Sequence, residues 1–176
     1  MLSIQEREKM KDIARRLDEM RAHLSGETPP LEDSVGWFTY LAKLKEIQGN
    51  SSNSVSFVGT LLAKQFLANR YGLVDFDAAE KPQSAPGIDI DVQVPDGRRL
   101  VAELKTTDPY KEKDFGAMQR KTIKKDFVKL LKAEADIKLF LVTNPNTFKF
   151  MQKSKYQSTV QGITVILLTT GEEFTA

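Results

Sequence analysis

One hairpin constrains the fold of this chain more than any other feature. Residues 87–105 alternate apolar and polar side chains with a period of two, the pattern of paired β-strands. A Pro-Asp-Gly sequence at residues 95–97 separates the two runs. Proline presets the first position of a type I turn, and Gly97 accepts the left-handed conformation that closes a three-residue loop. We therefore expect Val94 to lie opposite Arg98.

This turn determines which side chains share a face of the hairpin. Counting outward from it places Asp91 opposite Val101 and, two residues farther on, Asp89 opposite Glu103. Lys105 then points the same way as Glu103. A two-residue loop would instead pair Asp89 with Leu104, so the register tests the turn. The other face is apolar and is expected to be core: Ile88, Ile90, Val92, Val94, Leu100, Ala102 and Leu104.

The facing acids suggest a metal site. Directly opposed side chains of an antiparallel pair lie about 4.5–5.5 Å apart at Cβ, and like charges there repel. A cation between Asp89 and Glu103 would relieve that repulsion, and Mg²⁺ prefers oxygen ligands of this kind. Lys105 adds a positive charge beside the pair, which suits a negatively charged substrate. The alternative is a solvent-facing strand side on which charges simply alternate.

The rest of the chain indicates an α/β fold. Helical periodicity and short apolar runs predict helices near residues 33–47, 55–71, 115–134 and 146–156, and strands near 138–143 and 162–168. Strands that alternate with helices after a hairpin imply a mixed central sheet flanked by helices. Residues 1–54 read as a helical extension, packed on the core or on a dimer partner, and residues 55–176 as the core. We expect a single domain overall.

Composition narrows the possible classes of protein. The 176 residues include 26 Lys and Arg against 24 Asp and Glu, a net charge of +2, and no cysteine. Disulfide scaffolds and thiolate metal sites are excluded. Residues 1–24 are too charged for a signal peptide, and no run approaches the roughly 20 apolar residues of a membrane span. We expect a cytoplasmic protein that does not enter membranes.

The hairpin residues carry a family resemblance. Pro86-Gly87-Ile88-Asp89, followed by Glu103-Leu104-Lys105, resembles the PD-(D/E)xK motif of the restriction-endonuclease-like nucleases. The resemblance implies that Asp89 and Glu103 bind Mg²⁺, for which Mn²⁺ can substitute, together with the main-chain carbonyl of Leu104. It also implies that Lys105 orients or helps to deprotonate the attacking water.

One departure from the family concerns an additional acid. Many members place a further glutamate on the helix before the hairpin, but residues 57–71 contain no acid. Asp91 and Glu46 are the candidates to replace it. The number of metal ions, and whether the site is active, therefore stay open.

The expected partner is double-stranded DNA. The helix predicted over residues 115–134 turns Ile123, Phe127, Leu130 and Leu131 inward and carries Lys121, Lys125, Lys129 and Lys132 outward. We expect phosphate contacts from a basic cluster near the acids: Lys111, Lys113, Arg120, Lys121, Lys124 and Lys125. An ordinary solvated helix face is the alternative.

These observations favour a Mg²⁺-dependent DNA endonuclease, a type II restriction endonuclease or a close relative that acts as a homodimer. A structure-directed nuclease of repair, recombination or phage function is a second possibility. A third is a catalytically silent nuclease-like module that binds DNA.

Overall fold

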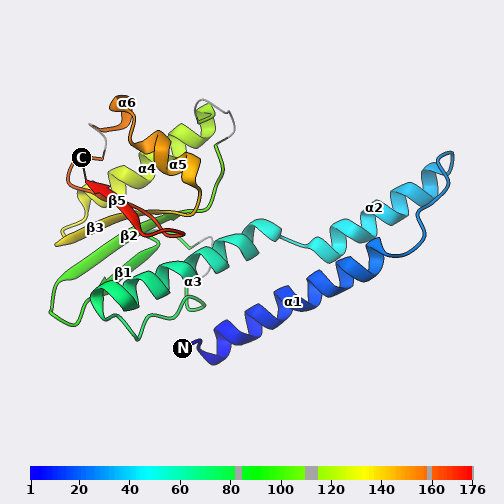
Figure 1. Ribbon diagram of the computed structural model, residues 1–176, viewed down its shortest axis with the longest axis horizontal. Helices are drawn as coiled ribbons and strands as arrows, with labels where there is room; N and C mark the ends of the chain where they lie inside the picture. Colours follow the sequence, from blue (N-terminus) through cyan, green and yellow to red (C-terminus); the bar gives the residue numbers. More distant parts are fainter. Residues whose placement is uncertain (82–84, 110–114, 158–159, 176) are drawn as a thin grey trace. The chain divides into compact units, whose positions relative to one another are not determined.

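The N-terminal helices begin at clear capping residues. In the computed structural model, Ser3 and Glu6 form a capping box at the start of α1 (Ile4–Leu24), each side chain accepting from the other's backbone N–H. Asp33 caps α2 (Ser34–Gln48) by accepting from the backbone N–H of Gly36. The two helices lie side by side (Figure 1), and His23 stacks on Tyr40 with ring centroids 4.3 Å apart.

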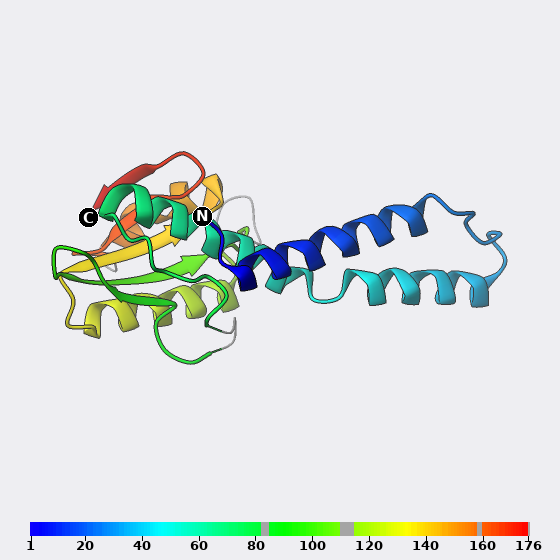
Figure 2. The same ribbon diagram turned by 90° about the horizontal axis from the view of Figure 1, so that it is seen from below.

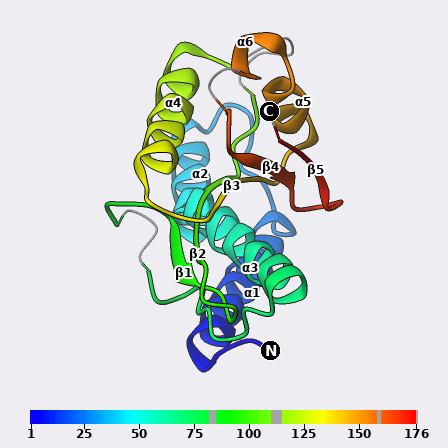
Figure 3. The same cartoon turned by 90° about the vertical axis from the view of Figure 1, so that its left-hand side faces the viewer.

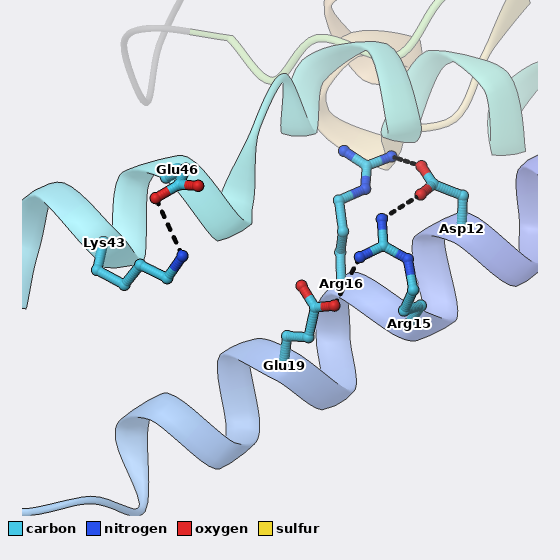
Figure 4. A network of polar contacts seen from close by, with 6 residues as sticks. All are labelled: Asp12, Arg15, Arg16, Glu19, Lys43 and Glu46. Carbon is cyan, nitrogen blue, oxygen red and sulfur yellow. Dashed lines mark hydrogen bonds and ion pairs between the residues drawn. The ribbon is translucent and has the colours of Figure 1, made fainter.

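Ion pairs between largely exposed side chains lie along these two helices. Figure 4 shows Arg15 between Asp12 and Glu19, with Arg16 on the second oxygen of Asp12 at 2.7 Å. Pairs three or four residues apart on a helix contribute only a few tenths of a kcal/mol each. They support the helices without specifying a partner.

The chain divides into two compact units within α3 (Ser51–Tyr71), at Val55 and Ser56. The structure describes residues 1–81, 85–109, 115–157 and 160–175. Helix α3 begins four residues before its predicted start. No helix in the described ranges is long and apolar enough to cross a membrane. Packing of the extension on the core or on a second copy stays a prediction.

The described residues of the second unit form a five-stranded mixed sheet, which confirms the predicted α/β class. Its strands lie in sequence order: β1 (Ile90–Gln93), β2 (Arg99–Lys105), β3 (Ile137–Val142), β4 (Thr164–Leu167) and β5 (Glu172–Thr175). The β2–β3 and β3–β4 pairs are parallel, and the two outer pairs are antiparallel. Helix α4 (Ala117–Lys132) connects β2 to β3. The helix predicted over residues 146–156 is two helices, α5 (Pro145–Met151) and α6 (Ser154–Gln157).

The hairpin has the predicted register. Asp91 pairs with Val101, and the backbone N–H of Val94 donates to the Arg98 carbonyl at 2.9 Å. Gly97 has φ of 90°, the left-handed conformation that the three-residue loop requires. The Pro-Asp-Gly turn was therefore interpreted correctly.

Most of β2 and β3 is buried on both faces of the sheet, whereas β1 keeps one exposed face at Asp91 and Gln93. One face packs on α3 through residues such as Leu100 and Ala102, and the other packs on α4 and α5 through Val101 and Phe140. Figures 2 and 3 show α3 and α4 on opposite sides of the sheet. Ile88 was assigned to the wrong face: it packs with the α4 cluster, because the strand pairing ends at Ile90.

Two residues of α4 also differ from their predicted positions. Leu131, expected inward, is 45% exposed. Lys129, expected on the outward ridge, turns toward the sheet and contacts Glu103. The inward face of α4 instead includes Asp126, which is buried beside Ile123 and Phe127.

Glycine is required where α3 approaches the end of β2. A Cβ added at Gly59 would lie 2.6 Å from Cγ2 of Thr106. We expect Gly59→Ala to lower the free energy of unfolding by about 1–3 kcal/mol, because overpacking of a buried contact costs that much. Urea denaturation measures the change.

Thr106→Ser supplies the matched control, since it removes only the methyl group that clashes. In this background Gly59→Ala should be neutral or stabilise by up to about 1 kcal/mol, the helix preference for alanine over glycine. Equal destabilisation in both backgrounds would contradict the clash.

Candidate active site

The hairpin brings Asp89 and Glu103 together. Continuing the register of β1 and β2 by one residue places Asp89 opposite Glu103. The strand pairing itself ends at Ile90, one residue after Asp89, but the charge of Asp89 still raises the pKa of Glu103, so the two carboxylates lie close together. The two acids therefore lie at the same end of the hairpin.

Asp89 is held in place by the backbone of β2. Its Oδ2 accepts a hydrogen bond from the Leu104 N–H at 2.9 Å. A continued strand ladder would pair that N–H with the carbonyl of Ile88, which instead accepts from the Lys81 ammonium. The Asp89 carboxylate thus takes the place of the next main-chain acceptor in the ladder, and the hydrogen bond from the Leu104 N–H orients it.

Glu103 is the buried member of the pair, with its side chain 1% exposed. Burial raises the pKa of Glu103 to about 7, and the charge of Asp89 adds to that effect. The hydrogen bond from Lys129 acts in the opposite direction, and the charge of Asp126 raises the pKa further. A positive charge near these carboxylates is therefore needed to keep Glu103 ionised at neutral pH.

Lys105 lies beside the acids but is paired with a residue outside the motif. Its Nζ is 2.6 Å from Oδ2 of Asp126, and both side chains are largely buried. Asp126 comes from α4, which packs over this end of β2. The sequence interpretation missed Asp126, although its spacing from Ile123 and Leu130 puts it on the inward side of the helix.

Lys129 is the second residue that the sequence interpretation did not assign to the site. Its Nζ donates to Oε1 of Glu103 and to the carbonyl of Gly87, each at 2.9 Å. Burial opposes its charge, but the hydrogen bond to Glu103 and the charges of Glu103, Asp126 and Asp89 raise the pKa of Lys129 above its ordinary value. The ammonium is therefore held firmly in its charged form.

A cleft of about 220 Å³ opens beside Asp89 and Lys105. Hydroxyl groups and charges line much of it: Ser56 and Thr60 from α3, Thr106 and Thr107 after β2, and Asp77 and Lys81 before the hairpin. The α3 segment supplies hydroxyls here in place of an acid. This polar cleft can accept an anionic group next to Asp89 and Lys105.

The two candidates for an additional acid are both paired elsewhere. Asp91 makes a bidentate pair with Arg99, at 2.8 and 3.0 Å, which lowers the pKa of Asp91. Glu46 belongs to the first compact unit, where it pairs with Lys43 at 3.1 Å (Figure 4). Neither contacts Glu103 in a described hydrogen bond or ion pair.

The predicted DNA contacts lie partly on the exposed side of α4. Arg120, Lys121, Lys124 and Lys125 are exposed, and Arg120 also donates to the Phe115 carbonyl. Lys111 and Lys113 lie outside the described residues. The described cations therefore extend along the helix that also supplies Asp126 and Lys129.

The donors at the end of the hairpin suit a hard divalent cation, since they are carboxylate and carbonyl oxygens. Asp89 and Glu103 supply two carboxylates, and the Leu104 carbonyl is the candidate main-chain donor. Among the described residues no three His, Cys, Asp or Glu side chains are grouped so as to hold a metal. Any further ligands would therefore have to be water or substrate oxygens.

Comparison with protein-family models, curated proteins and solved structures finds no match for this chain.

The pH dependence of the free energy of unfolding should reveal the raised pKa of Glu103. The folded protein keeps the Glu103 proton up to about pH 7, whereas an unfolded glutamate loses it near 4.5. Because the folded state then binds more protons, this residue makes the free energy of unfolding fall as pH rises between those values. In metal-free buffer, urea denaturation should show a weaker fall for Glu103→Gln than for the unchanged protein.

Glu134→Gln is the control, because Glu134 is exposed two residues after the end of α4. It should keep the pH dependence of the unchanged protein. The same slope in Glu103→Gln would contradict the assignment of a raised pKa to Glu103.

Proposed function

We propose that this protein is a Mg²⁺-dependent DNA endonuclease that hydrolyses phosphodiester bonds. The observation that carries the proposal is the convergence of Asp89, Glu103 and Lys105 at one end of the β1–β2 hairpin, beside a polar cleft. Opposed carboxylates next to a lysine are an arrangement suited to a metal ion and an anionic substrate.

Asp89 and Glu103 are the residues that would hold the metal, with the Leu104 carbonyl as a third donor. Bound Mg²⁺ would neutralise charge on the phosphate and lower the pKa of a bound water. The orientation of Asp89 by the Leu104 N–H favours a fixed ligand position. The raised pKa of Glu103 comes first from burial and then from the charge of Asp89, so a bound cation would favour its ionised form.

Lys105 is proposed to act on the substrate phosphate and the attacking water. In hydrolysis the attacking water loses a proton as its oxygen bonds to phosphorus, the bond from phosphorus to one sugar oxygen breaks, and that sugar oxygen takes up a proton from solvent, so that no net proton is lost. The Lys105 ammonium can stabilise the negative charge that builds on the other phosphate oxygens. Its pairing with Asp126 holds the side chain over the cleft that both Lys105 and Asp89 line.

The basic side of α4 supports double-stranded DNA as the substrate. Arg120, Lys121, Lys124 and Lys125 are exposed on the helix that also supplies Asp126 and Lys129. Lysine and arginine that neutralise phosphates make binding fall steeply with salt. We propose that these residues guide the DNA backbone toward the cleft.

More specifically, we propose that the second unit has a restriction-endonuclease-like core. The protein would then be a type II restriction endonuclease or a close relative that acts as a cytoplasmic homodimer. The sequence of hairpin, α4, β3, helices and β4 supports this fold assignment. The motif at Asp89, Glu103 and Lys105 supports the enzyme class. A homodimer would give two sites for cutting both strands.

A catalytically silent DNA-binding module is the second candidate, because specific contacts favour it. Lys129 already neutralises Glu103, and Asp126 already neutralises Lys105. A protein that never binds metal would retain these pairs permanently.

Plasmid cleavage tests the proposed function. The purified protein should cut plasmid DNA with Mg²⁺ or Mn²⁺ and lose this activity in excess chelator. Glu103→Ala should reduce the cleavage rate by about 100-fold or more, the typical loss when a group that stabilises the transition state is removed. Glu134→Ala, at an exposed glutamate, should cleave at the rate of the unchanged protein.

Full activity in Glu103→Ala would refute the proposed site. No cleavage under any of these conditions, with DNA binding intact, would favour the silent module. Discrete fragments belong to a site-specific restriction enzyme, whereas preference for single-stranded or branched DNA would indicate a structure-directed nuclease.

A further inference from the structure

Lys129 lies where a cation is required. Its ammonium bridges Oε1 of Glu103 and the carbonyl of Gly87, at 2.9 Å from each. Gly87 precedes Asp89 by two residues, and the charges of both Glu103 and Asp89 attract the ammonium. A carboxylate and a main-chain carbonyl are also the donors that a hard divalent ion prefers.

A lysine and a divalent ion cannot both occupy this position without strong repulsion. Two positive charges that share one carboxylate oxygen would lie within a few ångströms of each other, in a partly buried setting where Coulomb interactions are strong. Binding of one must therefore weaken or displace the other.

We propose that Lys129 is the internal counter-cation of the Asp89 and Glu103 pair, and that a divalent cation displaces its ammonium on binding. The inference rests on the proposed function, since it takes these acids as the metal ligands. It assigns to Lys129 a positioning role: the residue keeps the two carboxylates together in the metal-free protein.

Asp126 gives the displaced ammonium a place to go. Lys129 Nζ already lies 3.5 Å from Oδ1 of Asp126, three residues earlier on α4. The other oxygen of Asp126 holds Lys105. A small side-chain movement therefore transfers Lys129 from Glu103 to Asp126 without leaving its charge unpaired.

Thermal unfolding with and without Mg²⁺ tests the inference, in the absence of DNA and at about pH 8.5, above the pKa of Glu103. Lys129→Met keeps much of the aliphatic stem but removes the charge. Without metal it should unfold at a lower temperature than the unchanged protein. Mg²⁺ should stabilise it more, with half of the effect reached at about a tenfold lower Mg²⁺ concentration, because no ammonium competes.

Two further variants make the test specific. Lys129→Arg retains a competing charge and should respond to Mg²⁺ like the unchanged protein. Lys132→Met removes an exposed lysine three residues away on the same helix and should do the same. If Lys129→Met does not fold without metal, Mg²⁺ should restore its folding, and failure to do so would overturn the inference.

The outcomes separate this inference from the proposed function. An Mg²⁺ response that disappears in Asp89→Ala but is equal in Lys129→Met and the unchanged protein rejects the displacement alone. Absence of any Asp89-dependent Mg²⁺ response rejects the metal site, and the displacement with it.

Discussion

Burial of the Glu103 carboxylate beneath α4 is the constraint on which the rest of this site depends. An ionised carboxylate inside a protein is costly unless another charge compensates it. Lys129 provides that charge, and Asp126 does the same for Lys105 on the next inward position of β2. Helix α4 must therefore present an anion and a cation one turn apart. This requirement fixes the position of α4 along the strand.

The opposite face of the sheet is covered by close packing of α3 rather than by ion pairs. Gly59 lets α3 approach Thr106 so closely that a single methyl group would collide with it. The end of β2 is thus held between a close backbone contact on one side and an ion-pair cluster on the other. Side chains that follow β2 line the cleft together with residues of α3 and of the segment before the hairpin.

The local chemistry of the turn made the hairpin predictable, whereas the partners of its charges were not. A three-residue Pro-Asp-Gly loop sets the register of the strand pairing. The turn residues alone were therefore enough to predict that Asp91 pairs with Val101. Strand length was less predictable: Asp89 takes the Leu104 N–H, which ends the ladder and moves Ile88 to the other face. The role of Lys129 was missed because the lysines of this helix were expected to face outward. Sequence alone does not show that an acid lies beneath the helix.

The charge balance of this cluster makes the near-neutral composition of the chain compatible with a polyanionic partner. Three carboxylates, of Asp89, Glu103 and Asp126, and two ammonium groups, of Lys105 and Lys129, leave this cluster with one net negative charge above the pKa of Glu103. A divalent cation would reverse that sign to one positive charge. A single phosphodiester, with one negative charge, would then neutralise the cluster. The cluster would thus repel phosphate without metal and attract it with metal, so substrate binding and metal binding would be coupled through charge alone.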